Sequence, residues 1–141
     1  MGFCDESTGI QNRVLGRDFV KIIVMNTEEN KNTVLAYAKM WNEHKAELAE
    51  EILADTYIDH AHPELVGPRA IAATVDKALA AMPDFHIEMT SMIAEDNLVA
   101  FREVITMTRA GVSQKLEGMS FVRLKGGKMT DRWTCYDRTD K

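Results

Sequence analysis

The chain has 141 residues, of which 45% are hydrophobic and 28% charged, and its net charge of −5 gives a pI near 5.4. This length suits one domain with its own core. The acidic balance argues against a nucleic-acid-binding protein, which normally presents a basic face. The longest apolar runs fall far short of the roughly 18 residues that span a bilayer, and the acidic N-terminus does not match a signal peptide. We therefore expect a cytoplasmic protein without nucleic-acid or membrane partners.

The two cysteines, Cys4 and Cys135, lie far apart and in no metal-binding spacing. We expect two reduced thiols, as is usual inside cells, although a disulfide between them stays possible. The pair His60 and His62 offers two nitrogens but no third ligand at a recognisable spacing, so the sequence predicts no metal site. It contains no glycine-rich phosphate loop either, and we expect no cofactor.

The N-terminal part divides into three segments. Residues 1–17 show no clear period, whereas residues 18–25 (DFVKIIVM) have the composition of a strand. That strand could pair with a partner subunit or pack on its own domain. We expect an N-terminal extension over residues 1–24 and a single domain over residues 25–141. A first helix begins at Asn26 or Thr27, with Val34, Ala38 and Trp41 on one face.

Two further helices are predicted before the first long strand. An apolar stripe from Ala46 to Leu53 indicates a short second helix, and residues 57–68 (YIDHAHPELVGP) form an irregular stretch. The third helix runs from about Arg69 to Met82, where Pro83 stops it.

Everything after Pro83 is predicted to be sheet. The runs Phe85 to Ile93, Leu98 to Arg109, Lys115 to Leu124 and Lys128 to Asp137 are separated by short turns. Helices followed by consecutive antiparallel strands predict an α+β fold.

Five motifs and one aspartate carry a resemblance to a known family. They are YIDHAHP (57–63), GPRAI (67–71), MPDFHIEM (82–89), EDNLVAFR (95–102) and FVRLKGGKMTDRW (121–133), with Asp137 after them. In this order the chain resembles the SnoaL-like polyketide cyclases of the nuclear transport factor 2-like superfamily. The resemblance implies a cone-shaped, curved antiparallel sheet wrapped around three N-terminal helices, with one deep pocket. It also implies a homodimer.

At several positions where the resembling family carries catalytic side chains, this chain has different residues. The pocket acid of the cyclases corresponds most nearly to Ser120, which cannot act as an acid at neutral pH. A histidine at the end of the preceding strand is replaced by Arg109, which can support an enolate but cannot shuttle protons. The similar epoxide hydrolases have an arginine at Arg102, but their two carboxylates correspond to Val104 and Thr134. Epoxide hydrolysis is therefore disfavoured.

Three residues are the candidates for catalysis. His60, beside Asp59, is the candidate base, because the similar steroid isomerases have a carboxylate base in this region. Arg102 would support an oxyanion, and Asp137, near Trp133, would be the acid or an orienting group. Each has a simpler alternative: His60 can pack over the pocket rim, Arg102 can be a charge on the outer face, and Asp137 can form a salt bridge.

Six residues are expected to line or bind in the pocket: Tyr57, Asp59, Met107, Arg109, Ser120 and Trp133. The nine methionines suit a pocket for a hydrophobic, irregular ligand, and equally suit an ordinary core.

Two functions follow as hypotheses. The first is a cyclase or isomerase that moves a proton next to a carbonyl of a hydrophobic, polyketide- or terpenoid-like molecule. The second is a pocket protein that binds a small molecule or a partner without catalysis.

Overall fold

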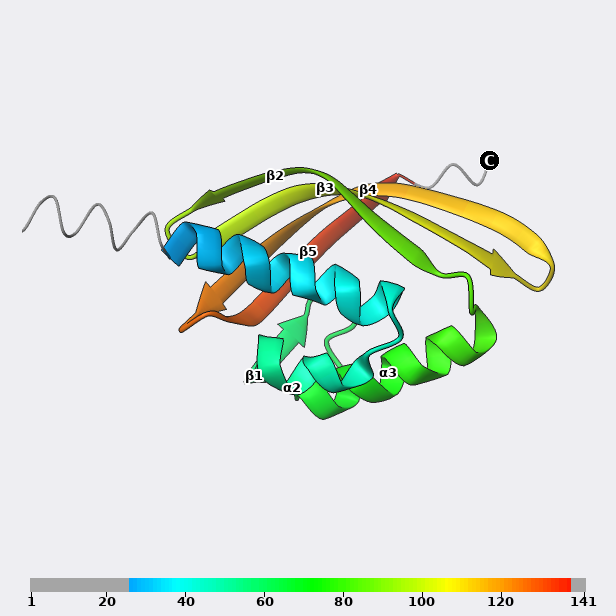
Figure 1. Ribbon diagram of the computed structural model, residues 1–141, viewed down its shortest axis with the longest axis horizontal. Coiled ribbons are helices and arrows are strands. Elements are labelled where there is room, and N and C mark those ends of the chain that lie inside the picture. The colour runs from blue at the N-terminus through cyan, green and yellow to red at the C-terminus, as the bar shows by residue number, and fades with distance from the viewer. Residues whose placement is uncertain (1–25, 138–141) are drawn as a thin grey trace, which may run out of the picture.

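The computed structural model describes residues 26–137, which form a curved five-stranded sheet with its helices on one face (Figure 1). The first helix covers residues 26–42, and a 3-10 turn, η1 (Ala46–Leu48), leads into the short α2 (Ala49–Ile52). Strand β1 (Leu53–Asp59) precedes α3 (Gly67–Ala81). The remaining strands are β2 (His86–Glu95), β3 (Leu98–Arg109), β4 (Val112–Lys125) and β5 (Lys128–Asp137). The predicted α+β class is confirmed.

The strand order is β1-β5-β4-β3-β2. Strands β2 to β5 form the antiparallel meander expected from the sequence, because each connection is short enough to join neighbouring strands. Strand β1 departs from the expectation: it pairs with β5 in parallel, so the sheet is mixed rather than wholly antiparallel.

The prediction of an irregular stretch over residues 57–68 was wrong at its start. Tyr57 to Asp59 belong to β1, and Asp59 pairs with Arg132 of β5. The segment TYID is short, and its partner strand lies far along the chain, so no local pattern distinguishes it from a loop. The turn that follows leads to Gly67, which has a φ of +83° and lies close to the carbonyl of Asp55. A side chain there would meet that backbone oxygen.

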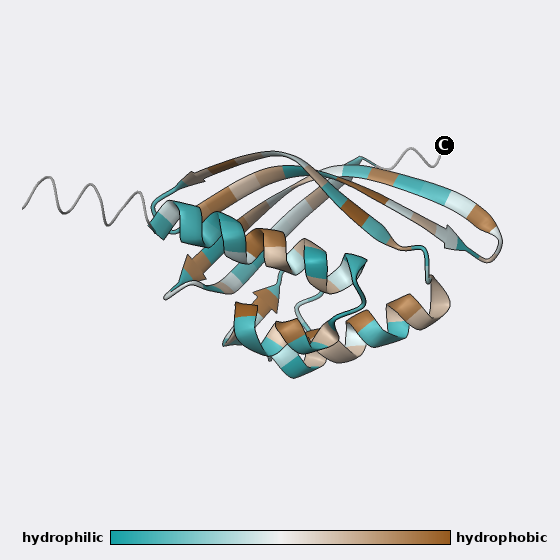
Figure 2. Ribbon diagram, viewed as in Figure 1, coloured by the Kyte–Doolittle hydropathy of each residue, from teal (hydrophilic) through white to brown (hydrophobic). Residues whose placement is uncertain are grey.

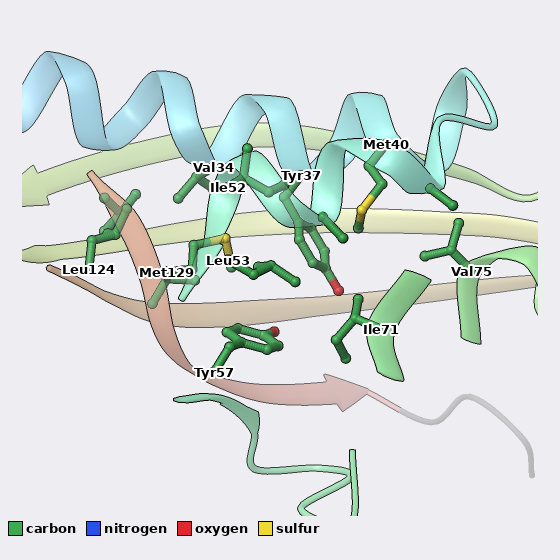
Figure 3. Close-up of a cluster of buried hydrophobic side chains, with 14 of the residues drawn as sticks. Val34, Tyr37, Met40, Ile52, Leu53, Tyr57, Ile71, Val75, Leu124 and Met129 are labelled. Carbon is green, nitrogen blue, oxygen red and sulfur yellow. The ribbon is translucent and has the colours of Figure 1, made fainter. Parts of the chain in front are cut away.

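The core lies between the sheet and the helices. Hydrophobic and hydrophilic residues alternate along the strands (Figure 2), as expected when one face of a sheet is covered and the other is not. The larger buried cluster joins the first helix, α2, β1 and α3 to the sheet (Figure 3). Its fully buried members are Val34, Met40, Ala49, Leu53, Tyr57, Val75, Val99, Val122 and Met129.

A smaller cluster lies toward the other end of the sheet. It consists of Ala38, Met82, Ile87, Ile105 and Met107, with Trp41 and Phe85 packed against it. No helix within residues 26–137 is both long and apolar enough to cross a membrane. The predicted extension with its boundary at residues 24–25, the strand over residues 18–25 and Cys4 all lie outside the described residues.

Candidate functional site: a buried charge cluster

Strand β3 presents alternate side chains to the helices. Phe101, Glu103 and Ile105 are all buried, and the side chain of Glu103 has no exposed surface at all. A carboxylate at the centre of an apolar face is unusual, because removing its charge from water is costly unless partners compensate. The side chains that surround Glu103 therefore form the candidate site.

Three donors converge on one oxygen of Glu103. Its Oε1 accepts hydrogen bonds from Arg132 Nη2 at 2.7 Å, from the Ser120 hydroxyl at 2.8 Å and from the Tyr136 hydroxyl at 3.1 Å. These donors come from β4 and β5, the two strands beyond β3 in the sheet. We call Glu103, Arg132, Ser120, Tyr136 and Asp59 the buried charge cluster.

Arg132 is the cation of this cluster. Its Nη1 lies 3.5 Å from Asp59 Oδ2, and its guanidinium sits 5.2 Å from the centre of the Tyr37 ring. Burial by itself would lower the pKa of Arg132, but the surrounding Tyr37 and Glu103 hold the pKa above its ordinary value. The guanidinium therefore stays charged and faces two carboxylates, which matches the need to pair buried charges.

Tyr136 and Ser120 complete the polar contacts. Burial raises the pKa of Tyr136 to about 12, and the neighbouring charge of Glu103 acts in the same direction. The phenol is therefore protonated at neutral pH and donates to Glu103. The Ser120 hydroxyl also lies 2.9 Å from that of Thr134, where either oxygen can be the donor.

Two polar atoms of the cluster keep unused hydrogen-bonding capacity. Within residues 26–137, Oε2 of Glu103 and Nε of Arg132 are buried and have no hydrogen-bond partner. The Nε1 atom of Trp41, next to the smaller apolar cluster, is also buried and has no hydrogen-bond partner among these residues. Leaving such a group unsatisfied costs about 1–3 kcal/mol, so each of these atoms favours a polar group of a water or a ligand.

The cluster can therefore do two kinds of chemistry. Oε1 of Glu103 is occupied by three donors, which fix the carboxylate and leave Oε2 to accept a proton. Arg132 offers Nε–H to an oxygen that becomes negative. A carboxylate and a fixed cation in a dry site are the groups that enolisation requires.

Some predicted pocket residues lie on this covered face. Asp59 and Ser120 belong to the buried charge cluster, and Asp59 Oδ1 also accepts the Ala61 backbone N–H at 3.0 Å. Tyr57 is fully buried in the larger core, and its burial raises the pKa of its phenol above the usual range. Met107 is buried in the smaller cluster.

The three candidate catalytic residues lie elsewhere. Arg102 and Asp137 are exposed and alternate with the buried residues of β3 and β5. His60 follows β1 and binds Asp131 through Nε2 at 3.0 Å, with about a third of its side chain exposed. These residues therefore do not converge with Glu103, and their catalytic role stays a prediction. Arg109, at the end of β3, is also exposed.

The uncovered face of the sheet carries a hollow of about 600 Å³, which we call the outer groove. His60 and Arg102 belong to its lining. Ser120 and Thr134, from the covered face, also contribute to the lining. The other main side chains are Ile93, Ala100, Met119, Phe121, Trp133 and Cys135. Their strand register places them on the face opposite Glu103.

Sequence reasoning missed Glu103, Arg132 and Tyr136 as site residues. Glu103 could have been found, because it falls in phase with Phe101 and Ile105 on a strand whose alternation is regular. Arg132 gives no such signal. The β4–β5 register shifts between Arg123 and Leu124, and this irregularity breaks the alternation along β5.

Metal binding finds no support in the described part of the chain, where no group of three His, Cys, Asp or Glu side chains could hold an ion. The methionines at positions 40, 82, 107 and 129 are buried in the two apolar clusters, whereas Met119 is 63% exposed in the outer groove.

Comparison with known proteins agrees with the fold. A family model described as SnoaL-like polyketide cyclase matches residues 31–140. A SnoaL-like polyketide cyclase from Agrobacterium tumefaciens is 16% identical, with 77% of this chain and 91% of that chain covered and a TM-score of 0.67. TsrD from Streptomyces laurentii is 12% identical, with 78% and 89% covered and a TM-score of 0.69.

A third structure, a Catenulispora acidiphila protein with a ketosteroid isomerase-like fold, is 19% identical. It has 76% of this chain and 86% of that chain covered, with a TM-score of 0.66. No curated protein matches the sequence. At these identities the solved structures support the fold, and the family model covers most of the chain.

Proposed function

Because the chain belongs to the SnoaL-like polyketide cyclase family, we propose that it is a cyclase or isomerase that needs no cofactor. Its substrate is a hydrophobic, oxygenated molecule of the polyketide or terpenoid kind, as in secondary metabolism. The reaction moves a proton on a carbon next to a carbonyl. The homodimer expected from the sequence stays part of this proposal.

The observation that carries the proposal is the free oxygen of a buried carboxylate. Oε2 of Glu103 accepts no hydrogen bond within residues 26–137, while three donors hold Oε1. We assign Oε2 the role of proton acceptor and Arg132 Nε the role of donor to the enolate oxygen. This assignment gives the proton transfer to Glu103, which accepts a hydrogen bond from Ser120 on the adjacent strand.

In this proposal the substrate reaches Glu103 through the smaller apolar cluster, whose packed side chains move aside. Ile105 and Met107 continue the covered face of β3 directly beyond Glu103, and Met82 closes α3 beside them. Methionine side chains are flexible, so Met82 and Met107 can move aside for a hydrophobic ligand. Trp41 Nε1 supplies one more donor at this end.

Proton exchange on a simple ketone tests the proposal without knowledge of the natural substrate. The probe is 1-tetralone in D₂O, with deuterium incorporation at its α-carbon followed by NMR. We expect the protein to accelerate exchange above buffer, and Glu103→Gln to lower the catalysed rate by about 100-fold or more. Glu117→Gln, which removes an exposed carboxylate from β4, is the matched control and keeps the rate.

Two results would overturn the assignment. Folded Glu103→Gln with full exchange activity would remove Glu103 from the mechanism. Exchange no faster than buffer, together with a thermal shift of the wild-type protein by 1-tetralone, would instead support the second function, a binding protein without catalysis. That function is favoured by the position of His60 and Arg102 in the outer groove, away from Glu103.

A further inference from the structure

The indole N–H of Trp41 is a buried hydrogen-bond donor whose acceptor is missing. Within residues 26–137, its Nε1 atom is buried and has no hydrogen-bond partner. An indole nitrogen can only donate, and a buried donor without an acceptor costs free energy. Oε2 of Glu103 and Nε of Arg132, which are in the same condition, act in the proposed proton transfer. Trp41 Nε1 takes no part in that transfer, so its acceptor must come from another group.

A water molecule is a poor partner for this N–H. A buried water normally makes about three hydrogen bonds. The indole packs against the Phe85 ring, with the centroids 4.7 Å apart, and against the smaller apolar cluster. The adjacent Asn42 amide is already occupied, because its Oδ1 accepts the Ile87 N–H at 2.7 Å and its Nδ2 donates to the Ile87 carbonyl at 2.8 Å. An acceptor carried on a hydrophobic molecule therefore suits this position better than water does.

The indole also lies beside the substrate's route to Glu103. The Asn42 hydrogen bonds fix the end of the first helix to Ile87 of β2, which pairs with Ile105 of β3. Ile105 is the next inward-facing residue of β3 after Glu103, about 7 Å further along the strand. Trp41 packs against the cluster to which Ile105 belongs. A ligand that is held at Glu103 and extends along this face therefore reaches the indole with its far end.

We propose that Trp41 is a specificity-determining residue that binds a second oxygen of the substrate. The substrate then carries two acceptors. One is the carbonyl oxygen beside Arg132 Nε, and the other is a carbonyl, ether or hydroxyl oxygen at the far end of the hydrophobic skeleton. This role rests on the proposed function and narrows its substrate class to molecules with two separated oxygens, since a hydrocarbon end would leave the indole N–H unpaired.

Two matched ketones test this role. The first, trans-decalin-1,5-dione, has a second carbonyl on the far side of its skeleton, and the other, trans-1-decalone, lacks it. Titration calorimetry measures the dissociation constant of each ketone, and deuterium exchange measures proton transfer at the carbon next to a carbonyl. We expect the wild-type protein to bind the dione roughly tenfold more tightly, including the factor of two that the symmetry of the dione contributes.

Two changes at position 41 remove the N–H. Trp41→Phe also shortens the ring, whereas β-(3-benzothienyl)alanine at this position replaces only the N–H with sulfur and keeps the shape that packs against Phe85. We expect either change to lower the preference for the dione to about twofold. Trp133→Phe is the control, because it makes the same substitution in the outer groove, and it keeps the wild-type preference.

Binding and exchange distinguish this role from the proton transfer. A preference that depends on the Trp41 N–H, in a protein that does not accelerate exchange, supports the contact and overturns the proton transfer. Exchange that depends on Glu103, with the same preference in the wild-type and benzothienyl proteins, overturns the role of Trp41 and leaves the proton transfer in place. Failure of both ketones to bind overturns both.

Discussion

The imidazole of His60 lies flat against the indole of Trp133, with the ring centroids 4.5 Å apart and the planes only 4° from parallel. The same imidazole binds Asp131, and the backbone N–H of His60 donates to the Arg132 carbonyl at 2.8 Å. Three contacts therefore hold the end of β1 against the uncovered side of β5. This position separates His60 from the buried charge cluster.

The stack leads to a prediction about catalysis. If Glu103 is the proton acceptor, His60→Ala and Asp137→Asn will retain deuterium exchange on 1-tetralone within about twofold, since neither side chain reaches the covered face. Glu103→Gln, measured alongside, loses activity. A loss of the order of 100-fold in His60→Ala with unchanged thermal stability would restore histidine as the base.

Asp131 links stability to pH at this same surface. Burial would raise its pKa, but hydrogen bonds from His60 and Thr130 and the charge of Arg123 lower the pKa below the usual 3.8. The native state thus favours the carboxylate, and this contribution is present above pH 3.8 and is lost as the pH falls through the lower native value.

We expect Asp131→Asn to lower the free energy of unfolding at pH 7 by about 0.5–1 kcal/mol. Urea titrations of both proteins from pH 7 down to pH 3 measure the difference. It will shrink below about pH 4, where the unfolded carboxyl is already protonated. A difference that stays constant over this range would contradict the role given to Asp131.

Breaking the buried pair will destabilise the protein more than removing it. Arg132→Met leaves Glu103 as an unpaired buried charge, and we expect a loss of about 3–5 kcal/mol in the free energy of unfolding. The double variant with Glu103→Leu removes both charges and will recover a large part of that loss. Denaturant titrations of the single and double variants measure the coupling, and simple additivity would contradict it.

Tyr136 makes alkaline pH destabilising. Its pKa in the folded protein is about 12, against an ordinary value of 10, so the native state favours the neutral phenol. Its contribution is complete below pH 10 and is lost as the pH rises from 10 to about 12. Tyr136→Phe will show a shallower loss of stability over this window than the wild type. Thermal unfolding from pH 8 to pH 11.5 measures it, and equal slopes would contradict it.

The absence of a side chain at Gly118 leaves space for the Tyr136 ring of the buried charge cluster. It lies opposite both Glu103 and Tyr136, and a Cβ there would come within 2.6 Å of the Tyr136 ring and 2.5 Å of the Cys135 carbonyl. We expect Gly118→Ala to lower stability by about 1–3 kcal/mol and to displace Tyr136. Ser113→Ala, at an exposed position of the same strand, is the control. Equal melting temperatures for the two variants would contradict this prediction.

Sequence periodicity was sufficient for most of the fold. The limits of β3 and β5 match the predicted runs, because β3 alternates regularly and the Gly126-Gly127 turn marks where β5 begins. Strand β1 was missed because its pairing with β5 is remote in sequence. Glu103 was not among the predicted site residues, and the structure shows that its side chain faces inward.

The site was harder to predict than the fold because its charges come from different strands. Nothing local connects Glu103 with Arg132, and the irregular register of β5 hides the direction in which Arg132 points. The resemblance directed attention to His60 and Arg102, whose side chains the structure places at the outer groove. The available signal was a carboxylate at a position where the alternation of the strand predicts a buried apolar residue. This signal predicts that the carboxylate is buried, and does not by itself predict a function.

The parallel pairing of β1 with β5 also bears on the order in which the chain folds. Asp59 and Arg132 are separated by 73 positions in the sequence. Strands β2 to β5, in contrast, are joined by short turns and can form as successive local hairpins. Closing the longer loop costs more entropy and comes late when local contacts form first. The charge pair between these two strands then completes only with the last strand to dock, so the cluster assembles at the end of folding.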